Sequence, residues 1–336
     1  MDEEIYLDEP IYDLKRARTG FSRIGLAFSA ILALGIAVQA LAMFLVSVSG
    51  VDAAVRESDW FLWLMSFLPL YLIAFPVGLL LMRKLPAQPP EQHKLGGMNA
   101  LVCFLIAIFL MYSGSILGTI LSAVFSGGAA TNDIADLVMN NHPLKVLFVV
   151  VLAPVLEEYV FRKQLLDRTR CYGEKTAALL SAVTFGLLHQ NLYQFFYAFA
   201  LGFLMAYIYL RTGRLRYSAI LHTVINFMGS VLAPWMLKLA DMEALSSIDP
   251  NMAYEEMLSF YAGILPGLLV ILGYSMLLMG MFVAGLVLFI IKSRNLTWLE
   301  GSEQLPRGTG LRTVYWNVGM VIYMLLCLVM IVVNLF

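Results

Sequence analysis

Long apolar stretches divide the chain, and they constrain its fold more than any other feature. An apolar stretch of about 18 residues or more is long enough, as a helix, to cross a bilayer. Two shorter apolar pieces, 176–189 and 195–210, flank a polar run and predict a helical hairpin. Together with seven longer stretches they predict an all-α, polytopic transmembrane helix bundle of eight to nine spans. The longer stretches are 24–48, 60–82, 99–125, 143–166, 217–238, 262–291 and 314–335.

Composition agrees with a membrane location. Hydrophobic residues make up 60% of the chain and charged residues 13%, whereas a soluble domain has about 25% charged residues. The net charge of -1 creates no extended basic or acidic field, so a nucleic-acid partner is not expected. Cys103, Cys171 and Cys327 are scattered and lack metal-ligand spacing, so no disulfide framework is expected either.

Basic residues occupy every second connection between the expected spans. This bias predicts an amino terminus in the cytosol and a carboxyl terminus outside. The basic connections contain Lys15, Arg16, Arg18, Arg23, Arg83, Lys84, Lys94, Arg162, Lys163, Arg168, Arg170, Lys175, Arg211, Arg214, Arg216, Lys292, Arg294, Arg307 and Arg312. The alternate connections are mainly acidic, with Asp52, Glu57, Asp59, Asp133, Asp136, Asp241, Glu243, Asp249, Glu255 and Glu256.

We expect one membrane domain built from four segments. Residues 1–23 form a cytosolic amino-terminal segment, and 24–97 hold two leading transmembrane helices and a linker. That linker is expected to be stiff and non-helical, because it contains Pro86, Pro89 and Pro90. Residues 98–238 form the core, and 239–336 form an outer loop and two carboxyl-terminal helices.

Few ionisable residues lie inside the expected spans. A carboxylate at the centre of a spanning helix costs about 2.5–3.5 kcal/mol on insertion scales, so such residues are functional candidates by default. The core contains an acid pair late in the fourth span, one histidine at the end of the first hairpin piece, and a histidine and an asparagine in the 217–238 span. These residues are Glu157, Glu158, His189, His222 and Asn226.

The spacing of these residues suggests a division of tasks. Glu158 and Arg162 are four residues apart, which suits an ion pair on one helix face near the cytosolic rim. The Glu157 side chain points about 100° around the helix from Glu158 and is free for another task. Pro154 cannot donate a backbone hydrogen bond, so carbonyl groups are left for water or polar side chains to satisfy. His222 and Asn226 share a face.

Each of these features also has a purely structural interpretation. The Glu158–Arg162 pair could be a salt bridge at the membrane rim, and a lone histidine in a membrane is often a hydrogen-bonding contact between helices. Gly114 and Gly118 form a small-residue face that we expect only to pack helices. The aromatic cluster Tyr193, Phe195, Phe196 and Tyr197 is expected to pack or to lie at the interface, although it could line a substrate groove.

Three short patterns in the core resemble those of the CPBP membrane proteases. This family comprises type II CAAX prenyl endopeptidases and Abi-like bacteriocin-processing or self-immunity proteins. Its marks are Glu-Glu-x-x-x-Arg, Phe-x-x-x-His and His-x-x-x-Asn on successive helices. In this chain they run from Glu157 to Arg162, from Phe185 to His189 and from His222 to Asn226. The resemblance covers 143–230, about a quarter of the chain.

The resemblance implies a membrane endopeptidase with its catalytic cavity between the core helices. Glu157 would activate water as the general base, and His189 would help to hold that water. His222 and Asn226 would stabilise the oxyanion, while Glu158 and Arg162 would keep the helix and the base in position. The same residues could work without a cofactor, or Glu157, His189 and His222 could hold a divalent metal such as zinc. The contiguous His-Glu-x-x-His pattern of other membrane zinc proteases is absent.

The resemblance further implies peptide or protein substrates, including prenylated or membrane-associated ones, and a bacterial plasma membrane location. Two other functions stay open: a non-catalytic immunity or scaffold protein of the same family, and a proton-coupled transporter, although no inverted repeat is found.

The expected depths of the site residues in the membrane do not agree. At about 1.5 Å per residue, His189 would lie deeper than Glu157 and His222, so we expect 165–175 to dip towards the bilayer or lie along it.

Overall fold

The computed structural model describes residues 13–131, 143–239 and 252–336, and every regular element in them is a helix. The expected all-α polytopic bundle is therefore confirmed. Six of the described helical stretches are long and apolar enough to cross a membrane. They are α1 (Leu14–Val48), the run Asp59–Met82, α5 (Gly97–Ser126), α11 (Leu192–Thr212), the run Leu215–Leu239 and α15 (Tyr254–Ser293).

Three further helical stretches coincide with the other expected apolar segments. One is a continuous run through α7 (Pro143–Lys145), η2 (Val146–Leu152), α8 (Ala153–Glu158), η3 (Tyr159–Gln164), α9 (Leu165–Thr169) and η4 (Arg170–Tyr172). The others are α10 (Glu174–Leu188) and α17 (Val318–Val333), which follows the short α16 (Gly310–Val314). The hairpin prediction is confirmed, because α10 and α11 pack together across a three-residue connection.

Two boundaries differ from those expected. Helix α1 begins at Leu14, inside the segment expected to precede the first span, because the Asp13 side chain accepts a hydrogen bond from the Arg16 backbone and caps the helix. The last expected span is broken ahead of α17, where Asn317 caps the new helix through Met320.

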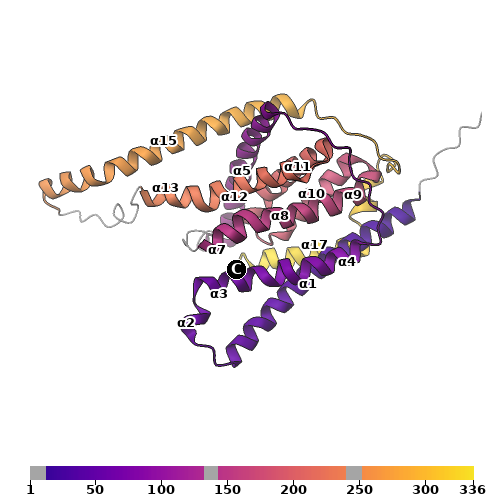
Figure 1. Cartoon of the computed structure of the whole chain (residues 1–336), viewed down its shortest axis with the longest axis horizontal. Helices are drawn as coiled ribbons and strands as arrows, with labels where there is room; N and C mark the ends of the chain where they lie inside the picture. Colours follow the sequence, from indigo (N-terminus) through magenta and orange to yellow (C-terminus); the bar gives the residue numbers. More distant parts are fainter. Residues whose placement is uncertain (1–12, 132–142, 240–251) are drawn as a thin grey trace, which may run out of the picture.

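The helices surround a core formed by α10 and α11 (Figure 1). Helix α11 packs against α5 and α10, while α1 packs against α17 and against the second span. That second span consists of α3 (Asp59–Leu68), η1 (Pro69–Ala74) and α4 (Phe75–Met82), after the short α2 (Ala53–Arg56). Gly114 and Gly118 confirm the packing prediction, since a side chain at either would strike the backbone of α11.

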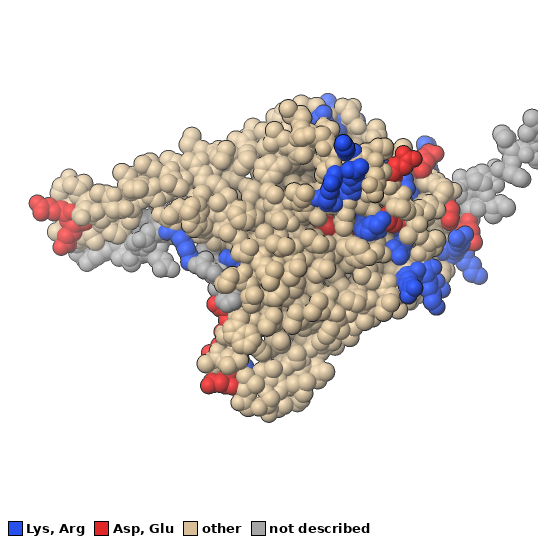
Figure 2. Space-filling model, in the orientation of Figure 1, with Lys and Arg blue, Asp and Glu red and all other residues tan. Residues whose placement is uncertain are grey.

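Charge separates the two ends of the molecule (Figure 2). Most lysines and arginines gather at the end where α1 begins, which we call the basic end. Glu255 and Glu256 lie in the first turn of α15, near the opposite end. The acidic residues Asp133, Asp136, Asp241, Glu243 and Asp249 lie outside the described residues.

The proline-containing linker after the second span is non-helical over 83–96, as expected. Gln88 attaches this linker to the core, because its N–H donates a hydrogen bond to the Asp167 carbonyl oxygen at 2.5 Å.

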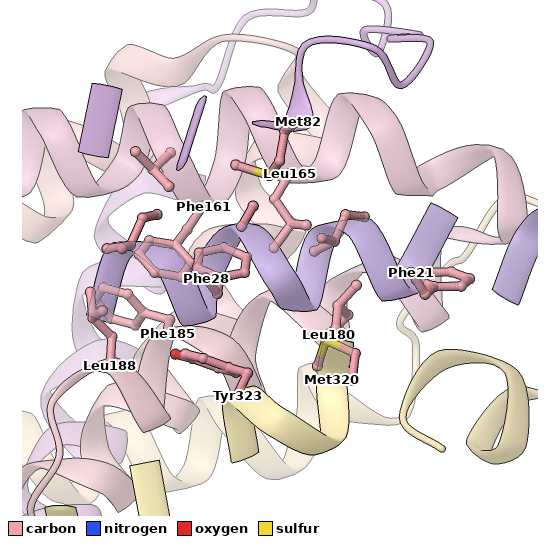
Figure 3. Close-up of a cluster of buried hydrophobic side chains, with 14 of the residues drawn as sticks. Phe21, Phe28, Met82, Phe161, Leu165, Leu180, Phe185, Leu188, Met320 and Tyr323 are labelled. Atoms are coloured by element: carbon pink, nitrogen blue, oxygen red, sulfur yellow. The ribbon is translucent and has the colours of Figure 1, made fainter. Parts of the chain in front are cut away.

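The largest apolar cluster joins the leading and last helices to the core (Figure 3). Phe28 on α1 stacks on Phe161 with ring centroids 5.1 Å apart. Tyr323 on α17 donates its hydroxyl to the Thr184 carbonyl on α10 at 2.8 Å. The helix that carries His189 is thereby supported from the far side of the bundle.

Prolines create wide helical turns in three spans. The π-helical stretches η1, η2 and η5 (Met228–Leu232) each end two residues before a proline, at Pro76, Pro154 and Pro234. A proline ring clashes with the carbonyl four residues earlier, and a π turn moves that carbonyl away. The carbonyl five residues earlier then faces a nitrogen that has no hydrogen. Each proline therefore frees one backbone acceptor inside a span.

Gly173 sets the register of the two helices that carry Glu157 and His189. Its φ of +107° is open to glycine but strained for other residues. Glu157 lies 16 residues before this turn and His189 lies 16 residues after it. Because the two helices run antiparallel from the turn, equal distances along the chain place the two residues at one level. The two residues therefore need not differ in depth. The helix continues to Thr169 with Leu165 and Leu166 buried, and the expected dip of 165–175 towards the bilayer stays a prediction.

We predict that Gly173→Ala lowers the stability of the protein by about 1–3 kcal/mol, because alanine is strained at this φ. The added Cβ would also meet the Gln304 side chain. Thermal unfolding in detergent measures the change. Gly263→Ala is the matched control: it has open space around its Cβ, and alanine favours the helix. Equal melting temperatures for the two variants would contradict the assignment of Gly173 as the register turn.

Candidate active site

The structure places His222 between the two acids of the Glu-Glu pair. Glu157 and Glu158 lie at the end of α8, and His222 lies on α12 (Leu215–Phe227). Nδ1 of His222 is 3.3 Å from Glu158 Oε1, and Nε2 is 3.8 Å from Glu157 Oε2. All three side chains are buried, with Glu157 8% exposed and Glu158 not exposed at all. Two patterns that are 64 residues apart in sequence therefore meet in one place.

Arg162 is buried in the centre of the bundle and does not lie at its rim. It is 0% exposed, and Nη2 is 3.1 Å from Glu158 Oε1. Nη1 donates to Ser181 Oγ on α10 at 2.7 Å, and the guanidinium lies 4.8 Å from the centre of the Phe185 ring. The predicted ion pair is confirmed, and its position near the cytosolic rim stays a prediction. The helix continues past Arg162 to Tyr172, so the basic end begins later than the first cation suggested.

His189 lies at the carboxyl end of α10, beside the same cluster. Its Nδ1 lies 2.9 Å from the Phe185 carbonyl oxygen. A carbonyl can only accept a hydrogen bond, so Nδ1 carries the hydrogen. Nε2 is left as an acceptor for another partner. Both histidine rings meet Phe185 edge-on, with centroid distances of 5.0 Å for His189 and 5.7 Å for His222. His189 also interacts electrostatically with Glu157 and His222.

Asn226 holds the acceptor that Pro154 frees. In η2, the N–H of Ala153 bonds to the Phe148 carbonyl, five residues back. Pro154 has no hydrogen to give the next carbonyl, that of Val149, and Asn226 Nδ2 donates to it at 2.9 Å. The prediction that Pro154 leaves a carbonyl for a polar side chain is confirmed. One Nδ2 hydrogen of Asn226 is used in this bond, and its second hydrogen has a different direction.

Tyr71, from the second span, is a further residue of the site that was not predicted from the sequence. Its hydroxyl donates a hydrogen bond to Oε1 of Glu157. Tyr71 lies in a long apolar run where a tyrosine carries no insertion cost comparable to that of a charge, and it belongs to none of the three patterns. The signal that could have found it is Pro76, five residues later, which marks a wide turn at Tyr71.

No metal-ligand cluster is found among the residues that the structure describes: no group of three or more His, Cys, Asp or Glu side chains is placed to hold an ion. In His222, Nδ1 lies 3.3 Å from Glu158, and in His189, Nδ1 lies against the Phe185 carbonyl, so each ring keeps Nε2 for another partner. A cavity of about 420 Å³ lies at the basic end, lined by the start of α1, Tyr172 and residues 301–305, and it contains none of the site residues.

Comparisons with known proteins point to membrane peptidases. The family described as "Type II CAAX prenyl endopeptidase Rce1-like" matches residues 139–228. A protein of Bacillus subtilis (strain 168), named "Putative membrane peptidase YdiL", is 29% identical over 165 residues, which are 46% of this chain and 66% of that protein. The match thus spans just under two thirds of the relative's length. No solved structure matches the chain. The family match contains all three patterns and excludes both leading spans.

We predict that Arg162→Met lowers stability by about 3–5 kcal/mol, because it leaves the Glu158 carboxylate buried without its cation. Adding Glu158→Leu should restore most of the loss, since the unpaired charge is then gone as well. Thermal unfolding of the single and double variants measures both effects.

The matched control for this prediction is Arg16→Met. Arg16 pairs with Glu303 at 4.0 Å, but its side chain is 62% exposed, so the change should cost less than about 1 kcal/mol. If Arg162→Met lowered the stability of the protein no more than this control, the result would contradict the importance of the buried ion pair.

Proposed function

We propose, from the membership of residues 139–228 in the CPBP family of membrane proteases, that the protein is a membrane-embedded endopeptidase using water activated by Glu157. The observation that carries the proposal is that His189 and His222 meet on the Phe185 ring, with His222 also beside Glu157. A buried carboxylate beside two imidazoles is a suitable general base, because water is scarce around it and proton carriers are near.

The proposed first step is attack of water on the scissile carbonyl carbon. Oε2 of Glu157 takes a proton from the water, while Nε2 of His189 holds the water from the other side. The oxygen–carbon bond forms, and the carbonyl electrons move to the oxygen. The second Nδ2 hydrogen of Asn226 and a protonated His222 would stabilise the resulting oxyanion.

The proposed second step is collapse of the tetrahedral intermediate. The carbon–nitrogen bond breaks, and Glu157 gives its proton to the leaving amine, which restores the carboxylate. Glu158 and Arg162 touch neither water nor peptide in this scheme. They hold His222 and the α8 helix in place through the contacts at 3.1 and 3.3 Å.

The protein is an integral membrane protein, and we propose that it lies in a bacterial plasma membrane with its amino terminus in the cytosol and its carboxyl terminus outside. The lysines and arginines at the basic end support this orientation. We propose peptide or protein substrates that reach the site at or within the membrane. Prenylated carboxyl-terminal peptides and bacteriocin leader peptides are the two classes to assay first.

We predict that Glu157→Gln lowers cleavage by the purified protein at least about a hundredfold, because the amide cannot take a proton from water. Melting temperature and membrane insertion should stay close to those of the unmodified protein. Cleavage of prenylated and unprenylated peptides in liposomes, followed by mass spectrometry, is the measurement.

Glu91→Gln is the matched control, because the Glu91 side chain is 93% exposed and lies in the linker. Cleavage that survives Glu157→Gln would contradict the proposed base, and a non-catalytic scaffold would show no cleavage with any variant. A chelator added to the unmodified protein should leave the rate unchanged. Loss of activity with chelator and recovery with zinc would overturn the metal-free scheme.

A further inference from the structure

We propose that Tyr71 is a positioning residue for this reaction: by binding one oxygen of Glu157, it selects the other oxygen as the base. The inference rests on the proposed function. Tyr71 lies on the second span, outside the stretch 139–228 that matches the peptidase family. The second of the two leading spans therefore contributes a side chain to the site.

The direction of the Tyr71 hydrogen bond is set by chemistry. The carboxylate of Glu157 has no hydrogen to give when it acts as a base, so the Tyr71 hydroxyl must donate to Oε1. Oε2 then faces His222, whose Nε2 is 3.8 Å away. At that distance no direct hydrogen bond occupies Oε2. Oε1 is engaged, and Oε2 is left for water.

The bond also restricts the orientation of the Glu157 side chain. Glu157 is only 8% exposed, so few water molecules compete for its oxygens. A hydrogen bond to a carboxylate is charge-assisted, and such bonds are about twice as strong as neutral ones. Tyr71 therefore fixes which oxygen of Glu157 faces His222.

An aromatic series holds the Tyr71 ring in place. The ring stacks on Phe67 with centroids 4.0 Å apart, and Phe67 stacks on Phe148 at 4.5 Å. Phe75 meets Tyr71 edge-on at 5.0 Å. Phe148 lies on η2, in the same helical run as Glu157. The series therefore joins the second span to the helix of the base, so the donor and the acceptor are held by one packed unit.

A second, partly buried tyrosine near the site has its hydroxyl hydrogen-bonded to a glutamine and not to Glu157. Tyr197 on α11 accepts a hydrogen bond from Gln194 Nε2 at 2.9 Å, and Gln194 is held in turn by Asn191. This chain of polar groups ends at the turn that follows His189. It supports the hairpin, whereas the hydroxyl of Tyr71 is bonded to Glu157 itself.

The test compares Tyr71→Phe with Tyr323→Phe in the liposome cleavage assay. Both changes remove one hydrogen-bonded hydroxyl and keep the ring, but Tyr323 bonds to the Thr184 carbonyl and not to an acid. We expect Tyr71→Phe to lower kcat about tenfold to a hundredfold, because the base is no longer held in one orientation. KM should change little, and Tyr323→Phe should change kcat much less.

Equal kcat values for the two tyrosine variants, or a loss that appears in KM and not in kcat, would overturn the proposal. A second measurement does not depend on catalysis. Melting temperatures of the unmodified protein, Tyr71→Phe, Glu157→Gln and the double variant form a cycle. Tyr71→Phe should lower the melting temperature clearly with Glu157 present, and at most half as much once Glu157→Gln is made.

The two measurements separate this inference from the proposed function. Cleavage that survives Glu157→Gln would reject Glu157 as the base, and with it the role of Tyr71, even if the thermal cycle shows coupling. Loss of cleavage in Glu157→Gln, together with no thermal coupling and equal kcat values for the two tyrosine variants, would reject the role of Tyr71 alone.

Discussion

The ion pair between Glu158 and Arg162 is the contact on which the arrangement of the site depends. Neither side chain reaches the molecular surface, so each charge must find its partner within the bundle. Arg162 also donates to Ser181, and Glu158 also meets His222. One pair on a single helix therefore fixes the positions of α10 and α12 relative to the Glu157 carboxylate. A buried pair is weak evidence for stability, but it allows few alternative packings.

Prolines provide the second constraint, because they release backbone acceptors where lipid offers no donor. The freed Val149 carbonyl binds Asn226, which draws α12 against η2 beside the acids. The same geometry occurs at Tyr71, whose own carbonyl lies five residues before Pro76. Wide π turns thus occur in the span that provides Tyr71, in the span that provides Glu157, and directly after Asn226. Such turns are frequent at functional sites, where they change the direction of side chains within an otherwise regular helix.

The sequence was informative where a residue is costly in lipid. Glu157, Glu158, His189, His222 and Asn226 stood out because charged or polar groups inside apolar stretches need partners, and the structure brings them into one region. Their catalytic roles stay predictions. The sequence did not show that Arg162 is fully buried, because the first cation after an apolar run can equally face water, whereas this one is paired inside the bundle.

Tyr71 shows why the rest of the site could not be read from the sequence. A tyrosine in an apolar run is compatible with packing, with the interface or with hydrogen bonding, and only the fold selects among these. Here the aromatic series from Phe67 to Phe148 brings the second span against the helix of the acids. The consequence is that the match over 139–228 contains Glu157 but not the tyrosine that donates a hydrogen bond to it. The site around Glu157 is therefore completed by a helix outside the matched segment, and under the proposed function the second span takes part in its chemistry.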